Sequence, residues 1–135
     1  KGEKESLQLG IDALKKMTGV TIYLSTNANT TSEDILSLQN VETICFSGKH
    51  PYGNVSVQAE KLGPINKGER IWYINLQDLI AIGKFFLEGK YYAQRLVALT
   101  GEEVLTPRYY KVILGTTISE IVKGNVNTEN HLRYI

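Results

Sequence analysis

The stretch CFSGKHPYGN, residues 45–54, carries the residue types in this chain that are best suited to chemistry. Lys49 and His50 lie between two glycines after an apolar run, and such a loop can cradle a phosphate or hold a catalytic imidazole. The glycine spacing of a P-loop, and the Ser or Thr that follows its lysine, are absent, so we do not expect nucleotide binding here. His50 has no assured nucleophile, metal or carboxylate partner, which favours a turn or a contact role. Gly53 is expected to supply a positive φ or a close backbone approach in that turn.

The composition is that of a globular chain with little net charge. Of 135 residues, 42% are hydrophobic and 21% are charged, and the formal net charge is +1. Acidic and basic residues are interspersed, so we expect no nucleic-acid surface, and the apolar runs are too short to cross a bilayer. The single cysteine, Cys45, excludes an internal disulfide and a cysteine-based metal site within these residues. The single methionine, Met17, and the opening KGEKES predict a piece of a larger protein. We predict no metal ion and no catalytic group.

The first half of the chain predicts a parallel α/β arrangement that would position the loop. Residues 5–19 form a helix with two apolar stripes that ends at Gly19. Residues 20–25 read as a buried strand, Ser32 begins a short helix, and residues 41–48 supply a second strand. Because a parallel pair needs a helical crossover, this order predicts a Rossmann-like half-sheet. The loop would then lie at the carboxyl end of a strand, where open α/β sheets bind ligands.

The middle of the chain predicts a strand followed by a long helix. Residues 69–75, ERIWYIN, read as a strand, and Asn75 is placed to cap a helix over residues 76–87 that ends before Gly89. That helix is apolar on nearly all sides, so we expect it to be buried between layers or against a partner.

The last third predicts a hairpin, a helix and a strand, which is the order of a β-grasp fold. Residues 91–99 and 108–114 are strand-like runs separated by a turn, and their tyrosines would form a cross-strand aromatic cluster. The members of this cluster are Tyr91, Tyr92, Tyr109 and Tyr110. Thr117 and Glu120 have the spacing of a capping box, and residues 131–135 read as a further strand.

Several of these segments resemble one family. WYINLQDLIAIGKFF, QRLVALTG, PRYYKVILGTTISEIV and the closing RYI, in this order, resemble the A subunit (NqrA) of the bacterial sodium-translocating NADH:quinone oxidoreductase. His50, Pro51 and Gly53 coincide with a His-Pro-x-Gly turn of that family. The family often has histidines where this chain has Gln58 and Glu60, so a histidine cluster beside the loop is not expected.

The resemblance implies a Rossmann-like α/β part over residues 1–70, a connecting strand and helix over 71–90, and a truncated β-grasp domain of the soluble-ligand-binding (SLBB) kind over 91–135. It implies a peripheral subunit on the cytoplasmic side of the bacterial inner membrane, in a complex that couples NADH oxidation and quinone reduction to sodium export. NADH and flavins would be handled by other subunits, and no cofactor would be bound in this part. The candidates for contact with quinone, another ligand or a neighbouring subunit are His50, Pro51, Gly53, Tyr91 and Tyr110.

Two alternatives remain open from the sequence. One is a free-standing β-grasp module that binds a small ligand. The other is the related C subunit of a ferredoxin-oxidising electron-transport complex, which adds cysteine-rich cluster motifs that Cys45 alone does not provide.

Overall fold

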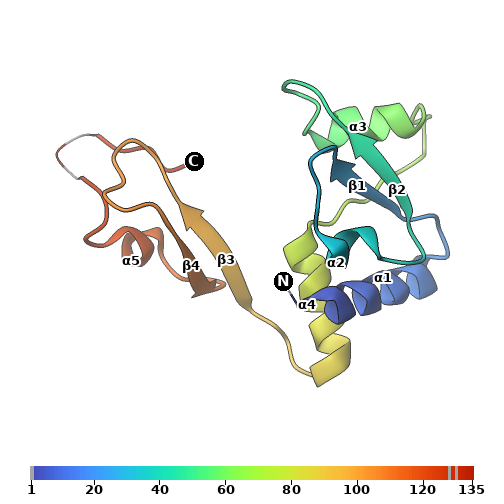
Figure 1. Cartoon of the computed structure of the whole chain (residues 1–135), viewed down its shortest axis with the longest axis horizontal. Coiled ribbons are helices and arrows are strands. Elements are labelled where there is room, and N and C mark those ends of the chain that lie inside the picture. Colours follow the sequence, from blue (N-terminus) through green and yellow to red (C-terminus); the bar gives the residue numbers. More distant parts are fainter. Residues whose placement is uncertain (1, 128, 130) are drawn as a thin grey trace. The chain divides into compact units, whose positions relative to one another are not determined.

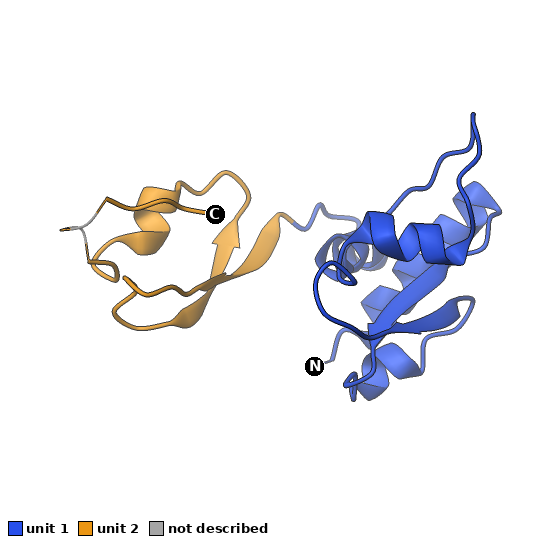
Figure 2. Cartoon of the chain, turned by 90° about the horizontal axis from the view of Figure 1, so that it is seen from above, with its two compact units in different colours: residues 1–92 blue, residues 93–135 orange. Residues whose placement is uncertain are grey.

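The computed structural model describes residues 2–127, 129 and 131–135 and divides the chain into two compact units, Lys1–Tyr92 and Ala93–Ile135 (Figures 1 and 2). Unit 1 contains α1 (Lys4–Thr18), β1 (Tyr23–Asn27), α2 (Glu33–Leu36), β2 (Glu42–Phe46), α3 (Val55–Leu62) and α4 (Leu76–Glu88). Unit 2 contains β3 (Gln94–Leu99), β4 (Arg108–Ile113) and α5 (Ile118–Val122). A parallel pair of strands followed by an antiparallel pair confirms the mixed α/β class expected from the sequence.

Unit 1 is organised by the packing of α1 against α4 (Figure 1). Two glycines permit this close approach. A Cβ built on Gly83 would lie 1.7 Å from the main-chain oxygen of Ser6, and one built on Gly10 would lie 2.6 Å from that of Leu79. Real Cβ atoms do not come that close to backbone, so the helices can meet here only because neither position carries a side chain.

The core of unit 1 lies beside this helix contact. Four buried side chains form it, and Leu14, Ile22, Leu24, Val41 and Ile80 pack around them. The four are Leu7, Ile11, Leu38 and Leu79. The stripe of α1 that contains Leu7, Ile11 and Leu14 therefore faces the core, whereas Met17, on the other stripe, is 75% exposed.

The two strands of unit 1 are parallel, as predicted. Tyr23 pairs with Glu42, and the register continues to Asn27 and Phe46 at the carboxyl ends. β1 begins at Tyr23, later than expected, and its residues are alternately exposed and half-buried. Its continuous apolar run therefore does not mark a strand that is buried on both faces.

Helix α4 has the caps that the sequence predicts. The Asn75 Oδ1 accepts a hydrogen bond from the Asp78 main-chain nitrogen at 3.0 Å, and Gly89 ends the helix with a φ of 66°. The Asp78 carboxylate also accepts from the Asn75 amide, so its charge is used at the helix start.

Unit 2 is a hairpin with one short helix. Val97 pairs with Tyr110 and Ala98 with Tyr109 in the antiparallel register of β3 and β4. The expected hairpin is confirmed. Thr117 does occupy the N-cap position of α5, but its side chain makes no capping hydrogen bond, so the capping box is not formed.

Two expected strands are not formed in the described residues, and one helix was not expected. Residues 69–75 and 131–135 form no strand, and residues 55–62, which we did not assign, form α3. The signal for α3 was present, because Asn54 and Gly63 flank its eight residues, but the helix is short and only Ala59 within it is buried.

Candidate functional site

The carboxyl ends of β1 and β2 meet at one edge of the sheet and border a cavity of about 280 Å³. Its lining comes from three segments: the end of β1, the end of β2 with the following loop, and α3. The lining residues are Ser25, Thr26, Asn27, Phe46, Ser47, Gly48, Tyr52, Gly53 and Gln58. The sequence therefore located the loop correctly, at the edge where parallel α/β sheets place ligands.

Gln58 of α3 links β1 to the loop that follows β2. Its Oε1 accepts a hydrogen bond from the Ser25 hydroxyl at 2.9 Å, and its Nε2 donates to the Tyr52 main-chain oxygen at 3.0 Å. Both ends of the amide are used, so Gln58 fixes the loop against β1. Sequence reasoning named Gln58 only as a position without a histidine and missed this bridging role.

Gly48, and not Gly53, is the glycine that the loop geometry requires. A Cβ on Gly48 would lie 2.8 Å from the Tyr52 ring, and the φ of Gly48 is 156°. Gly53 has no positive φ, and a Cβ there would meet nothing within 4 Å. The expectation of a special backbone at Gly53 was therefore wrong, because the sequence does not show which glycine the aromatic ring covers.

His50 is exposed in the loop and does not line the cavity. Its peptide bond to Pro51 is cis, and two turn hydrogen bonds hold the loop, from the Tyr52 nitrogen to the Lys49 oxygen at 3.1 Å and from the Asn54 nitrogen to the Pro51 oxygen at 2.8 Å. Within the described part of the chain, no hydrogen bond or ion pair involves the His50 ring. This geometry supports the predicted turn more than proton transfer.

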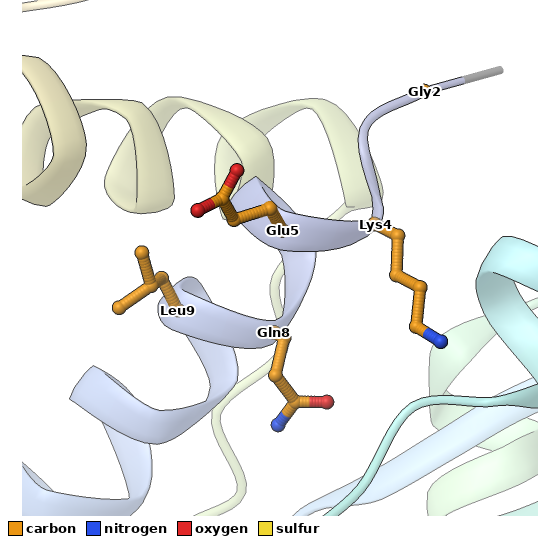
Figure 3. Close-up of a pocket in the computed structure, with 5 residues that line it drawn as sticks. All are labelled: Gly2, Lys4, Glu5, Gln8 and Leu9. Carbon is orange, nitrogen blue, oxygen red and sulfur yellow. The ribbon is translucent and has the colours of Figure 1, made fainter.

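A second, wider hollow of about 670 Å³ lies at the start of α1 (Figure 3). Lys4 and Glu5 point to different sides of the helix, so their charges do not converge on one point. Gln8 is engaged elsewhere, since its Oε1 accepts from the Gln39 nitrogen at 2.8 Å and its Nε2 donates to Asp12. This hollow has no set of convergent groups.

The predicted aromatic cluster is not formed. Tyr91 and Tyr92 precede β3 and belong to unit 1, while Tyr109 and Tyr110 lie on β4 and pair with Ala98 and Val97. Tyr91 is 71% exposed. The first strand of the hairpin begins only at residue 94, so the cross-strand pairing of these tyrosines was wrong.

Tyr110 belongs instead to a polar network around Asn125, a residue that sequence reasoning missed. The Tyr110 hydroxyl accepts hydrogen bonds from Arg108 Nε at 2.9 Å and from Asn125 Nδ2 at 3.2 Å. Asn125 is 2% exposed, accepts from the Thr106 nitrogen at 2.9 Å and donates to the Thr106 oxygen at 2.8 Å. The Asn125 amide thus satisfies both main-chain groups of Thr106, in the connection between β3 and β4.

Comparison with known families accounts for both units. Residues 1–91 match the family model described as the NqrA second alpha/beta domain, and residues 96–135 match the one described as the NQRA C-terminal domain, an SLBB domain. The chain belongs to the NqrA family.

Individual relatives agree with these NqrA matches. The chain is 33% identical to the A subunit of the Na(+)-translocating NADH-quinone reductase of Alcanivorax borkumensis over 93% of its own length, and 32% identical to that of Rhodopirellula baltica over 98%. To the Klebsiella pneumoniae protein of the same name it is 40% identical over 60% of its length. The chain covers 28% and 29% of the first two relatives, so it spans less than a third of their length.

The described residues of this NqrA chain contain neither a cluster of metal ligands nor a helix that could span a membrane. Among residues 2–127, 129 and 131–135, no three His, Cys, Asp or Glu side chains gather as metal ligands would. The helices in these ranges lack the length and the apolar run that spanning a bilayer requires.

Lys84 forms an ion pair with Glu3 at 2.9 Å and lies 4.2 Å from the centre of the Tyr92 ring. The hydrogen bond to Glu3 is the main reason why the pKa of Lys84 is raised, and it outweighs desolvation.

Proposed function

We propose that the complete protein is the NqrA component of a sodium-translocating NADH:quinone reductase, which couples NADH oxidation and quinone reduction to sodium export. The observation that carries this proposal is the succession of two NqrA domain matches over residues 1–91 and 96–135. Relatives that bear the name of this component align over more than nine-tenths of the chain. In the proposed organisation the chain contributes an α/β part followed, from about residue 91, by a β-grasp part.

The proposed role of these residues is to position and dock, not to transfer electrons. NADH oxidation and flavin chemistry belong to other subunits of the complex, and the NqrA component is peripheral on the cytoplasmic side of the membrane. The loop residues His50, Pro51 and Gly53, together with Tyr91 and Tyr110, are contact candidates for quinone or for neighbouring subunits. Tyr91 is exposed enough for such a contact, whereas the Tyr110 hydroxyl is already engaged in unit 2.

The cavity at the carboxyl ends of β1 and β2 supports a contact with a neutral, ring-bearing ligand. Its lining has hydroxyl and amide groups and the rings of Phe46 and Tyr52, with no charged side chain. A phosphate group would call for cations or a helix start aimed at it, and a quinone ring does not. With a volume of about 280 Å³ the cavity is smaller than most sites that enclose a whole ligand, so its proposed role is one wall of a quinone site.

The proposal is tested in membranes of a strain that lacks the gene for the full-length protein. Sodium-dependent NADH:quinone reduction should be lost and should return with the full-length gene. The 135-residue chain alone, mixed with NADH and a quinone analogue, should give no rate above background, because the proposal assigns NADH and flavin chemistry to other subunits. Unchanged activity in the deletion strain, or copurification of the full-length protein with a ferredoxin-oxidising complex, would contradict the proposal.

A further inference from the structure

Residues 70–74, between α3 and α4, form an exposed segment in which the four residues after Arg70 are large and mainly apolar. Ile71 is 49% exposed, Trp72 88%, Tyr73 73% and Ile74 41%. Consecutive residues of a β-strand point to opposite sides, so in a strand Ile71 and Tyr73 would lie on one side and Trp72 and Ile74 on the other. Both sides of such a strand would carry large apolar side chains, and all four are exposed here.

The main chain of this segment is also unpaired. None of the N–H and C=O groups of residues 70–74 hydrogen-bonds to any residue that the structure describes. Hydrogen bonds resume on either side, from the Glu69 nitrogen to the Asn66 oxygen at 3.0 Å and from the Leu79 nitrogen to the Asn75 oxygen at 3.0 Å. The segment has β-branched and aromatic residues, which favour strands, but it pairs with no strand among the described residues.

The sheet of unit 1 is itself incomplete. Within the described ranges, β1 and β2 pair only with each other. Parallel sheets occur almost only where both faces are covered and where several strands share the sheet. Tyr23 of β1 is 47% exposed, so this sheet too has apolar surface without a cover.

We propose that residues 70–74 are a β-strand in the full-length protein, paired with an extended segment of the same protein that lies outside these 135 residues. Several observations identify the occupant. The chain covers 28–29% of the length of its NqrA relatives, so more than two-thirds of such a protein is available to supply strands and covering layers. The unpaired main chain calls for a strand, and apolar side chains on both sides call for a layer over each face.

A second copy of this chain fits less well. Two copies that paired through this segment would satisfy one edge of main-chain groups and would leave Trp72 and Tyr73 uncovered on opposite faces. The remaining part of the same protein is large enough to supply both a strand and a cover for each face.

Hydrogen exchange read by mass spectrometry tests the proposal on two proteins, the 135-residue chain and the full-length protein. In the short chain the amides of residues 71–74 should exchange at the rate of unstructured peptide. In the full-length protein two alternate amides of these four should exchange at least about 10²-fold more slowly, because a ladder hydrogen bond must open first. The amides of Lys67 and Gly68 are the internal control and should exchange fast in both proteins. Fast exchange of residues 71–74 in both would overturn the proposal.

Proline substitution in the full-length protein distinguishes a strand from mere burial. A strand that pairs on one edge uses alternate N–H groups, so one of Trp72→Pro and Tyr73→Pro should abolish the protection of the whole segment, and the other should not. Lys67→Pro is the matched control, since Lys67 occupies the second position of a turn with Gly68 at a φ of 97°, where proline is favoured. Protection that survives both strand substitutions refutes pairing. Protection that appears in the short chain only as it dimerises assigns the segment to a second copy and also refutes the proposal.

Discussion

Gly83→Ala should destabilise unit 1, although alanine normally stabilises a helix interior. An added Cβ would lie 1.7 Å from the main-chain oxygen of Ser6, and a backbone atom cannot rotate away as a side chain can. Helices α1 and α4 must therefore separate by about 1 Å or more. That movement would loosen the contacts of Ile11 and Leu79, which are 1% and 5% exposed.

The expected magnitude is the difference between two effects. Overpacking costs about 1–3 kcal/mol, and replacing a helical glycine by alanine returns roughly 0.5–1 kcal/mol. We expect a net loss of about 1–2 kcal/mol, which in a unit of this size lowers Tm by roughly 5–15 °C. Gly10→Ala should act in the same direction with a smaller effect, because its Cβ would lie 2.6 Å from the nearest backbone atom. The two losses should not add fully, since a single separation of the helices relieves both.

The assay is thermal unfolding followed by circular dichroism, with Gly53→Ala as the matched control. Gly53 has no atom within 4 Å of a built Cβ and no positive φ, so its substitution should change stability by no more than about 0.5 kcal/mol. A Gly83→Ala chain with a Tm equal to or above that of the unsubstituted chain would refute the inferred close helix contact.

Three further outcomes are expected. His50→Gln in the assembled complex should leave quinone reduction within a few-fold of wild type, and a loss of about 10²–10⁴-fold in an intact complex would reveal a proton-transfer role. Asn125→Ala should destabilise unit 2 by about 1–3 kcal/mol, because the Thr106 main chain loses its buried partner; equal urea midpoints would contradict this. Because the pKa of Lys84 is raised above its ordinary value of 10.5, its pairing with Glu3 contributes fully below that pH and is lost as pH rises through the raised pKa. In urea unfolding, the Lys84→Met chain should therefore lose less stability between neutral and alkaline pH than the unsubstituted chain does. An identical pH dependence of stability in the two chains would contradict this.

The parts of the fold that the sequence predicts well are those with strong local signals. Helix α4 has a cap at Asn75, a glycine at its end and apolar residues at helical spacing, and all three are confirmed. The parallel pair and the hairpin follow from the order of elements and the lengths of the connections. Their boundaries shift by a few residues, and that shift alone was enough to misplace Tyr91 and Tyr92 on the hairpin.

The parts that the sequence does not predict depend on contacts between distant residues. The loop has two glycines of similar appearance, and only the position of the Tyr52 ring shows that Gly48 is the constrained one. The amides of Gln58 and Asn125 join segments far apart in the chain, which no local pattern marks. Residues 69–75 have the composition of a strand, but a strand also needs a neighbour, and none is present among the residues described.

The exposure of Trp72 also decides which process the intrinsic tryptophan fluorescence of this chain reports. Trp72 is the only tryptophan, and at 88% exposure its indole is solvated in the folded chain almost as it would be in the unfolded one. Its fluorescence should therefore change little as α1 and α4 come apart. An unfolding curve recorded by tryptophan fluorescence should show almost no transition. The same emission should shift strongly when a surface closes over residues 70–74, so the tryptophan is a reporter of docking and not of folding.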